Sequence, residues 1–134
     1  MKKISIAFSI LLIMLLIPAQ ASAHKTKPDA ANRAWGTFWR QFKVALNKKD
    51  RAALKRMMAT PFESGGADDT PAKWLKFMDK EDLWAQTQES AATGTRAFEE
   101  YSRDIGKPSR VTNRRHLIFV FSGGRWRWAA IMGD

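Results

Sequence analysis

Two adjacent glycines, Gly123 and Gly124, restrict the fold of this chain most, because they separate two segments in which apolar residues alternate. Every second position is apolar: Leu117, Phe119 and Phe121 before the glycines, and Trp126, Trp128 and Ala130 after them. Such alternation is typical of strands, and glycine readily adopts the positive φ of a two-residue turn. The sequence therefore predicts a β-hairpin at this position.

The turn also predicts which residues of the two strands face each other, because Ser122 and Arg125 must then form a pair. The pairs that follow are Phe121 with Trp126, Phe119 with Trp128, Val120 with Arg127 and Ile118 with Ala129. The aromatic pairs share one face with Leu117 and Ala130, so we expect helices to cover that face. The opposite face is half polar and is expected to lie near solvent. Residues 110–112 are a candidate third strand.

Helices are expected before the hairpin, and the first two are marked by apolar residues three and four positions apart. The first stripe consists of Trp35, Phe38, Trp39, Phe42 and Leu46. The second consists of Leu54, Met57 and Met58. We expect Asp29 to cap the first helix and Asn47–Lys49 to end it. Asp50 is expected to cap the second helix and Pro61 to end it.

The middle of the chain predicts a connector followed by two more helices. Residues 63–69 resemble a loop in composition, and they lack the Gly-Lys-Ser/Thr ending of a phosphate-binding loop. Thr70 followed by Pro71 predicts a helix start, because the hydroxyl caps the helix and proline suits its first turn. The apolar side of this helix consists of Trp74, Leu75, Phe77 and Met78. After a break near residues 79–82 the apolar pattern resumes toward Ala92.

Residues 95–105 are expected to be helical, with a strand as the alternative. The apolar and aromatic residues with helical spacing are Phe98, Tyr101 and Ile105. Gly106 and Pro108 follow as a suitable helix stop. With helices first and an antiparallel sheet last, the chain is predicted to be α+β.

Residues 1–23 have the three parts of a cleavable signal peptide. Two lysines precede the apolar run Ile4–Ile17, which is shorter than the roughly 20 residues that cross a membrane as a helix. Ala21–Ala23 then supplies the small residues that a signal peptidase requires. We therefore expect one exported domain, residues 24–134, in the periplasm or the medium, with no transmembrane anchor after processing.

Charge and cysteine content narrow the possible partners and chemistry. The formal net charge of +10 becomes +8 when Lys2 and Lys3 are removed with the signal peptide. A basic surface attracts polyanions, and outside the inner membrane these are lipid headgroups, lipopolysaccharide and cell-wall polymers rather than nucleic acid. The sequence contains no cysteine, so disulfides and thiol nucleophiles are excluded. Stability must come from packing, to which the six Trp and the seven Phe that follow the signal peptide contribute.

Two segments carry a resemblance to a known family. The stretch FWRQFKVALNKKDRAALKRMMATPF, Phe38–Phe62, resembles the helical start of small exported bacterial domains of the nuclear-transport-factor-like, or SnoaL-like, group. LIFVFSGGRWRWAAI, Leu117–Ile131, resembles their final hairpin. The resemblance implies a cone in which helices pack into the concave side of a curved sheet, often leaving a pocket. Residues 95–115 depart from the family pattern because they look helical where members have strand.

The candidates for catalysis are few. Enzymes of this group place an acid and a base inside the cone, and the nearest equivalents here are Tyr101, Asp104 and His116. Their spacing fixes no common pocket, so we expect Tyr101 to pack with its hydroxyl in water, Asp104 and His116 to face water, and none of them to be catalytic. An N-terminal His24 produced by cleavage could bind copper only with His116, and an exposed terminal histidine is the simpler interpretation. We therefore expect neither a metal nor a cofactor.

Aromatic residues are the candidates for ligand binding, although core packing explains most of them first. Those that a cone would place at its cavity are Trp39, Trp74, Phe119 and Trp128. We expect a non-enzymatic module that binds a small apolar ligand or an envelope partner. The alternatives are an isomerase-like or hydratase-like enzyme and an envelope protein that binds anionic polymers through its basic surface. The sequence does not indicate an oligomeric state.

Overall fold

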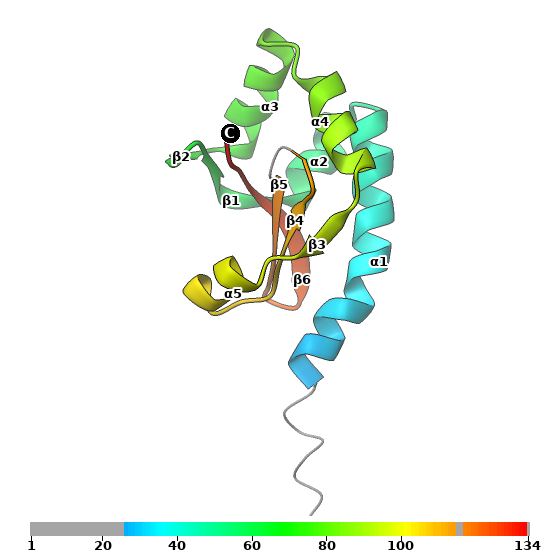
Figure 1. Ribbon diagram of the computed structural model, residues 1–134. Coiled ribbons are helices and arrows are strands. Elements are labelled where there is room, and N and C mark those ends of the chain that lie inside the picture. The colour runs from blue at the N-terminus through cyan, green and yellow to red at the C-terminus, as the bar shows by residue number, and fades with distance from the viewer. Residues whose placement is uncertain (1–25, 115–116, 134) are drawn as a thin grey trace, which may run out of the picture.

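The computed structural model describes residues 26–114 and 117–133, which form an α+β fold (Figure 1). The expected signal peptide and His116 lie outside these ranges. The helices are α1 (Thr26–Asn47), α2 (Arg51–Met57), α3 (Pro71–Lys80), α4 (Trp84–Ala92) and α5 (Glu99–Ile105). The strands are β1 (Met58–Ser64), β2 (Ala67–Asp69), β3 (Thr95–Ala97), β4 (Ser109–Thr112), β5 (Leu117–Ser122) and β6 (Arg125–Ile131). Within the described ranges, no helix combines the length and apolar character needed to cross a bilayer.

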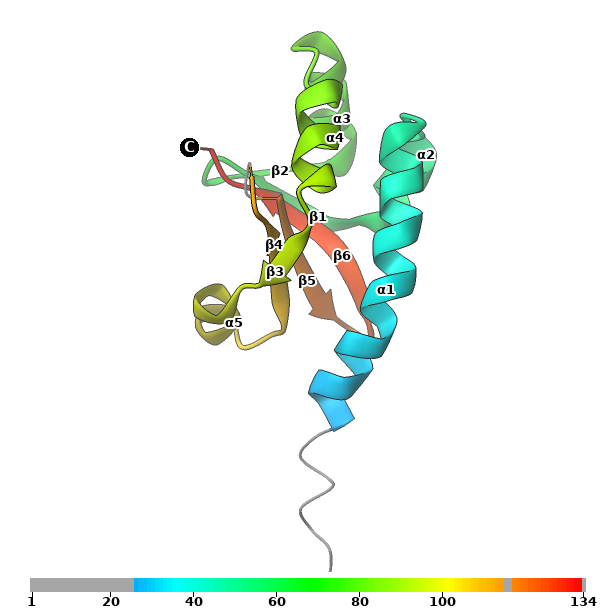
Figure 2. The same ribbon diagram turned by 45° about the vertical axis from the view of Figure 1, so that its right-hand side comes forward.

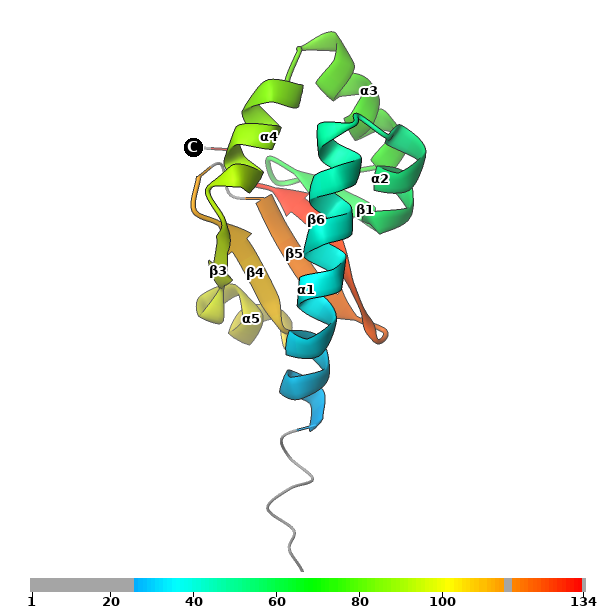
Figure 3. The ribbon, with the colours of Figure 1, turned by 90° about the vertical axis from the view of Figure 1, so that its right-hand side faces the viewer.

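The six strands form one sheet in the order β2-β1-β6-β5-β4-β3. Its neighbours are antiparallel except for β1 and β6, so the sheet is mixed rather than wholly antiparallel as expected. The parallel pair arises because the long chain between these strands returns β6 to the side of β1 in the same direction. Helix α1 runs along one face of the sheet and α5 lies on the other (Figures 2 and 3).

We call the two sides the helix face and the α5 face. The buried residues of the β5–β6 hairpin that pack in one core with helices α1 to α4 are Leu117, Phe119, Trp126 and Trp128, on the helix face. The buried residues of the α5 face are Val111, Ile118 and Ala130. Helices α1 to α4 therefore cover the aromatic side of the hairpin, as its composition predicts.

The hairpin of β5 and β6 has the predicted turn and most of the predicted register. Gly123 and Gly124 have φ values of 61° and 78°, and Phe119 pairs with Trp128. Beyond that pair the register shifts, and Ile118 pairs with Ala130 instead of Ala129. The prediction for Ile118 was therefore wrong. A bulge adds one residue to a strand and turns the following side chains over, which moves Ala130 from the helix face to the α5 face.

The α5 face is less open to solvent than its composition predicted. Val111, Ile118 and Ala130 are buried there, and the partly buried Phe98 and Tyr101 pack against them. Phe98 precedes α5 and Tyr101 belongs to it, so this short helix shields part of the second face.

The structure corrects the interpretation of residues 58–69. Helix α2 ends at Met57, and Met58 already begins β1, so Pro61 lies inside a strand rather than at a helix end. The β1–β6 register shifts between Met58 and Glu63, which is the kind of irregularity that accommodates proline in a sheet. Residues 63–69 are a hairpin rather than a simple connector, because β1 and β2 pair across the turn at Gly65.

Two of the three predicted helix caps are present. The Asp50 carboxylate accepts a hydrogen bond from the Ala53 amide at 3.0 Å, and the Thr70 hydroxyl accepts one from the Lys73 amide at 3.2 Å. The prediction for Asp29 was wrong, because α1 begins at Thr26 and Asp29 lies within the helix.

Residues 95–105 contain both predicted alternatives, a short strand and a helix. Residues 95–97 form β3, which pairs with β4, and the helix begins only at Glu99. Gly106 ends α5 with φ 67°, as its position predicted. The candidate third strand at residues 110–112 is present as part of β4.

Candidate functional site

A pocket of ≈ 600 Å³, here called the α3 pocket, lies where α3, the turn after β1 and the end of β6 meet. Its apolar lining residues are Trp74, Phe77, Leu83, Ile131 and Met132. Its polar side chains are those of Ser64, Asp69 and Lys73. Apolar walls with a few polar groups are typical of sites for small organic molecules.

Exposed apolar side chains gather at this pocket. Among the described residues, the large hydrophobic side chains that are extensively exposed are Val44 (52%), Phe77 (44%) and Met132 (44%). Two of these three line the α3 pocket. Single exposed apolar residues are common, but two around one hollow mark a surface that a partner or ligand can cover.

Trp74 forms the inner wall of the pocket. It is 7% exposed, and its ring lies 5.6 Å from that of Phe62 and 5.4 Å from that of Phe77, measured between centroids. Its indole nitrogen is buried without a hydrogen-bond partner, which is true of no other buried side-chain nitrogen or oxygen in the described residues. A buried donor left unpaired typically costs about 1–3 kcal/mol of stability. The hydrogen bonding of buried polar groups is therefore less complete on this side of the core than elsewhere.

The other predicted ligand-binding aromatics do not line the α3 pocket. Phe119 and Trp128 are fully buried in the core. Trp39 is half-buried on α1, where its ring stacks on that of Trp35 at 5.3 Å and meets the edge of Phe119 at 5.5 Å. Of the four aromatic candidates, only Trp74 borders this pocket, and the other three serve to pack α1 against the sheet.

The candidate acid and base residues are not brought together at the α3 pocket. Tyr101 packs on the α5 face, and its ring stacks on that of Phe98 at 5.4 Å. Burial, and secondarily the charge of Glu63, raises the pKa of Tyr101 above its ordinary value of 10.0. Asp104 is exposed on the same helix, and His116 lies outside the described residues.

Metal binding finds no support in the described residues, among which no group of three His, Cys, Asp or Glu side chains is placed to hold an ion. Both members of the copper pair considered above, His24 and His116, lie outside the part of the chain that the structure describes.

Sequence reasoning missed most of the α3 pocket. Phe77 looked like part of the apolar stripe of α3, yet it lies beside Trp74 at the pocket instead of in the core. Ile131 ends β6 and Met132 follows it, and no pattern there indicates what these two residues contact. The one available signal was the width of the apolar stripe on α3, which exceeds what one packed helix face needs.

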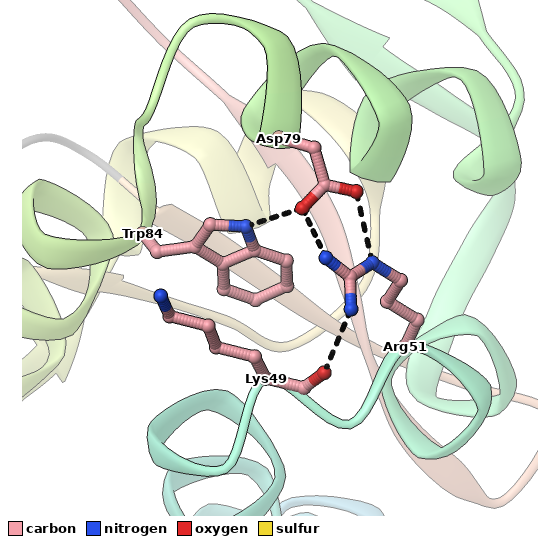
Figure 4. Close-up of polar contacts among 4 residues, drawn as sticks. All are labelled: Lys49, Arg51, Asp79 and Trp84. Atoms are coloured by element: carbon pink, nitrogen blue, oxygen red, sulfur yellow. Dashed lines mark hydrogen bonds and ion pairs between the residues drawn. The ribbon is translucent and has the colours of Figure 1, made fainter.

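A charged cluster joins the starts of α2 and α4 to the end of α3 (Figure 4). Arg51 binds both carboxylate oxygens of Asp79, with the Nε contact at 2.9 Å. The indole nitrogen of Trp84 donates to the same carboxylate at 2.8 Å, and the Arg51 guanidinium lies 5.4 Å from the Trp84 ring. The hydrogen bonds from Arg51 and Trp84 lower the pKa of Asp79 below its ordinary value of 3.8. Because these contacts link helices to one another, we interpret the cluster as structural.

Substituting Asp79 by asparagine should make the stability less sensitive to acid. A carboxyl group whose pKa is lower in the folded than in the unfolded state stabilises the fold at pH values above its unfolded-state pKa. That contribution is lost as the pH falls through its folded-state pKa. The stability difference between the natural chain and Asp79→Asn should therefore be largest near neutral pH and shrink as the pH falls below the ordinary carboxyl pKa of 3.8. Urea unfolding at about pH 7 and about pH 2.5 measures it. Asp82→Asn is the control, because Asp82 takes part in no ion pair among the described residues. An equal difference at both pH values would contradict the expectation.

Comparisons with family models, with curated proteins and with solved structures find no match for this chain.

Proposed function

We propose that this chain is an exported, non-enzymatic binding module that holds a small apolar ligand in the α3 pocket. The observation that carries the proposal is the exposure of Phe77 and Met132, each 44%, beside a hollow of ≈ 600 Å³. Pockets for small organic ligands fall between about 300 and 1,000 Å³. A ligand that covers these side chains would remove exposed apolar area from water, which is favourable.

The polar groups of the pocket suit orientation of a ligand rather than catalysis. The carboxylate of Asp69 accepts a hydrogen bond from the Thr70 amide at 2.9 Å, so it is fixed at the start of α3. Lys73 is exposed one turn further along the helix. Neither residue contacts a described partner that would activate it as an acid or a base.

The enzyme alternative receives less support from the described residues. Tyr101 and Asp104 belong to α5, on the side of the sheet opposite α1 (Figure 2). The binding role also agrees with the resemblance to the nuclear-transport-factor-like group, whose domains often leave a pocket between helices and sheet. Export rests on the signal-peptide pattern, and mass spectrometry of protein recovered outside the inner membrane should find a chain that starts at His24.

Substituting Phe77 by serine should weaken binding of an uncharged apolar probe. N-phenyl-1-naphthylamine is suitable, because its fluorescence rises in apolar surroundings and it carries no charge. Loss of the phenyl contact should raise the Kd roughly tenfold, in keeping with the about 1.5–3 kcal/mol that a buried Phe side chain contributes. Salt should have little effect, since the contact depends on burial rather than charge.

Val44→Ser is the matched control for this experiment. Val44 is the other largely exposed apolar residue named above, and it lies on α1 outside the α3 pocket. We expect this variant to bind the probe as the natural chain does. Equal weakening by both substitutions, or no saturable binding by the natural chain, would contradict the proposed function.

A further inference from the structure

A second hollow, of ≈ 550 Å³, lies on the α5 face and is here called the α5 cleft. Residues 58–60 of β1 form one wall, α5 with Lys107 forms another, and outward residues of β5 and β6 form its floor. It shares no lining residue with the α3 pocket. A site here would be independent of the proposed function.

Three cationic side chains line the α5 cleft: Lys107, Arg125 and Arg127. Arg125 and Arg127 are two positions apart on β6, so both point to the same side of the sheet. The ion pairs among the described residues are Arg51–Asp79, Lys80–Glu81 and Arg114–Glu89, none of which involves these three cations. Their positive charge is therefore not neutralised by a described carboxylate.

The arrangement of these cations is electrostatically unfavourable for Arg127. Its guanidinium donates one hydrogen bond, to the Ser122 carbonyl at 3.0 Å, and has further donors to offer. Burial, together with the charge of Arg125, lowers the pKa of Arg127 below its ordinary value. Like charges held side by side on a half-covered sheet repel each other, and an anion between them removes that repulsion.

The rest of the lining indicates an organic ligand rather than a bare ion. Tyr101, Ile105 and Val120 bring an aromatic ring and two apolar side chains to the cleft. Glu63, whose charge acts on Tyr101, lines a neighbouring hollow and not this one. The cleft thus combines three cations with a small apolar wall.

We propose that the α5 cleft binds a small, soluble phosphate monoester with an apolar substituent. Guanidinium groups form paired hydrogen bonds with phosphate oxygens, and a dianion balances three cations better than a single carboxylate does. A membrane surface fits less well, because Val44, Phe77 and Met132, the extensively exposed large apolar residues among those described, lie outside the cleft.

Titration with phenyl phosphate, followed by ¹H–¹⁵N NMR of the chain from His24, tests the proposal. Saturable shifts should appear at residues 101–107 and 120–129 and not around Phe77. Arg125→Gln with Arg127→Gln should raise the Kd at least about tenfold, because both phosphate-binding forks are lost. Lys107→Gln alone should raise the Kd about threefold. Because Lys107 is exposed and lies outside the strands, this variant tests the proposal even if the double variant unfolds.

Matched controls separate a built site from general charge attraction. Arg33→Gln with Arg40→Gln removes the same charge from exposed positions on α1, at the opposite face, and should change the Kd less than twofold. Phenylacetate, a monoanion, should bind at least about tenfold more weakly than phenyl phosphate. Equal effects of the two double variants, equal affinity for phenylacetate, or binding only to phosphatidic acid vesicles would each overturn the proposal.

Discussion

Replacing Trp128 by alanine should lower the free energy of unfolding by about 3–5 kcal/mol, the usual cost of removing a large aromatic ring from a core. Trp128 is fully buried, and its ring meets the edges of Phe42 at 5.4 Å and Phe62 at 5.1 Å. Its indole nitrogen also donates to the Ala130 carbonyl at 3.1 Å. The substitution therefore removes contacts to α1 and β1 at once and leaves a cavity between them.

Urea unfolding monitored by far-UV circular dichroism measures this loss. Phe77→Ala is the comparison, because this ring is 44% exposed and its removal should cost less than about 1 kcal/mol. If Trp128→Ala lowered the free energy of unfolding no more than Phe77→Ala does, the Trp128 ring would not be part of the core. The described packing of the hairpin against α1 would then be incorrect.

Replacing Gly123 and Gly124 together by valine should cost roughly 2 kcal/mol or more. Both glycines have positive φ, 61° and 78°, which strains a β-branched residue. No heavy atom outside the turn lies within 4 Å of the position of an added Cβ at either glycine. The expected loss is therefore conformational strain and not a steric clash.

Gly123→Asn distinguishes strain from simple loss of glycine. Asparagine accepts positive φ in primed turns, so this variant should retain most of the stability. Thermal unfolding of both variants measures the difference. A double valine variant as stable as the natural chain would show that the turn has another conformation.

The sequence predicted the C-terminal hairpin well because the information is local. A two-glycine turn fixes the first pairs, and the alternation of large aromatic residues identifies the face that faces the helices. The bulge was not predictable from that pattern, because Ala129 and Ala130 are both small and apolar, so either could occupy either face. The register shift there depends on how β6 fits between β1 and β5.

Strand β1 was missed because its identity depends on distant residues. Met58 continues the helical spacing of Leu54, and Pro61 is a plausible helix end, so nothing local separates strand from helix. β1 pairs with the short β2 across a tight turn, but its other partner is β6, which lies more than 60 residues later in the chain. Pairing over such separations leaves little trace in a single sequence.

The candidate site was less predictable than the fold for a related reason. Trp74 could be predicted as a ligand-binding candidate because it is a large aromatic residue that a cone-shaped fold would place at its cavity. Its neighbours at the α3 pocket come from α3, the turn after β1 and the segment beyond β6, which meet only in the folded state. The α5 cleft also combines β1, α5 and β6, so neither site corresponds to a local motif.

The position of β6 has a consequence for how the chain acquires its structure. β6 follows all the other described strands in the sequence, yet it lies between β1 and β5 inside the sheet. A nascent chain that lacks residues 125–131 holds a β1–β2 hairpin and a β3–β4–β5 ribbon with no strand to join them. Synthesis proceeds from the N-terminus, so cooperative folding must wait until these residues have emerged from the ribosome. Until β6 emerges, the edges of β1 and β5 with which it will pair remain unpaired and open to chaperones.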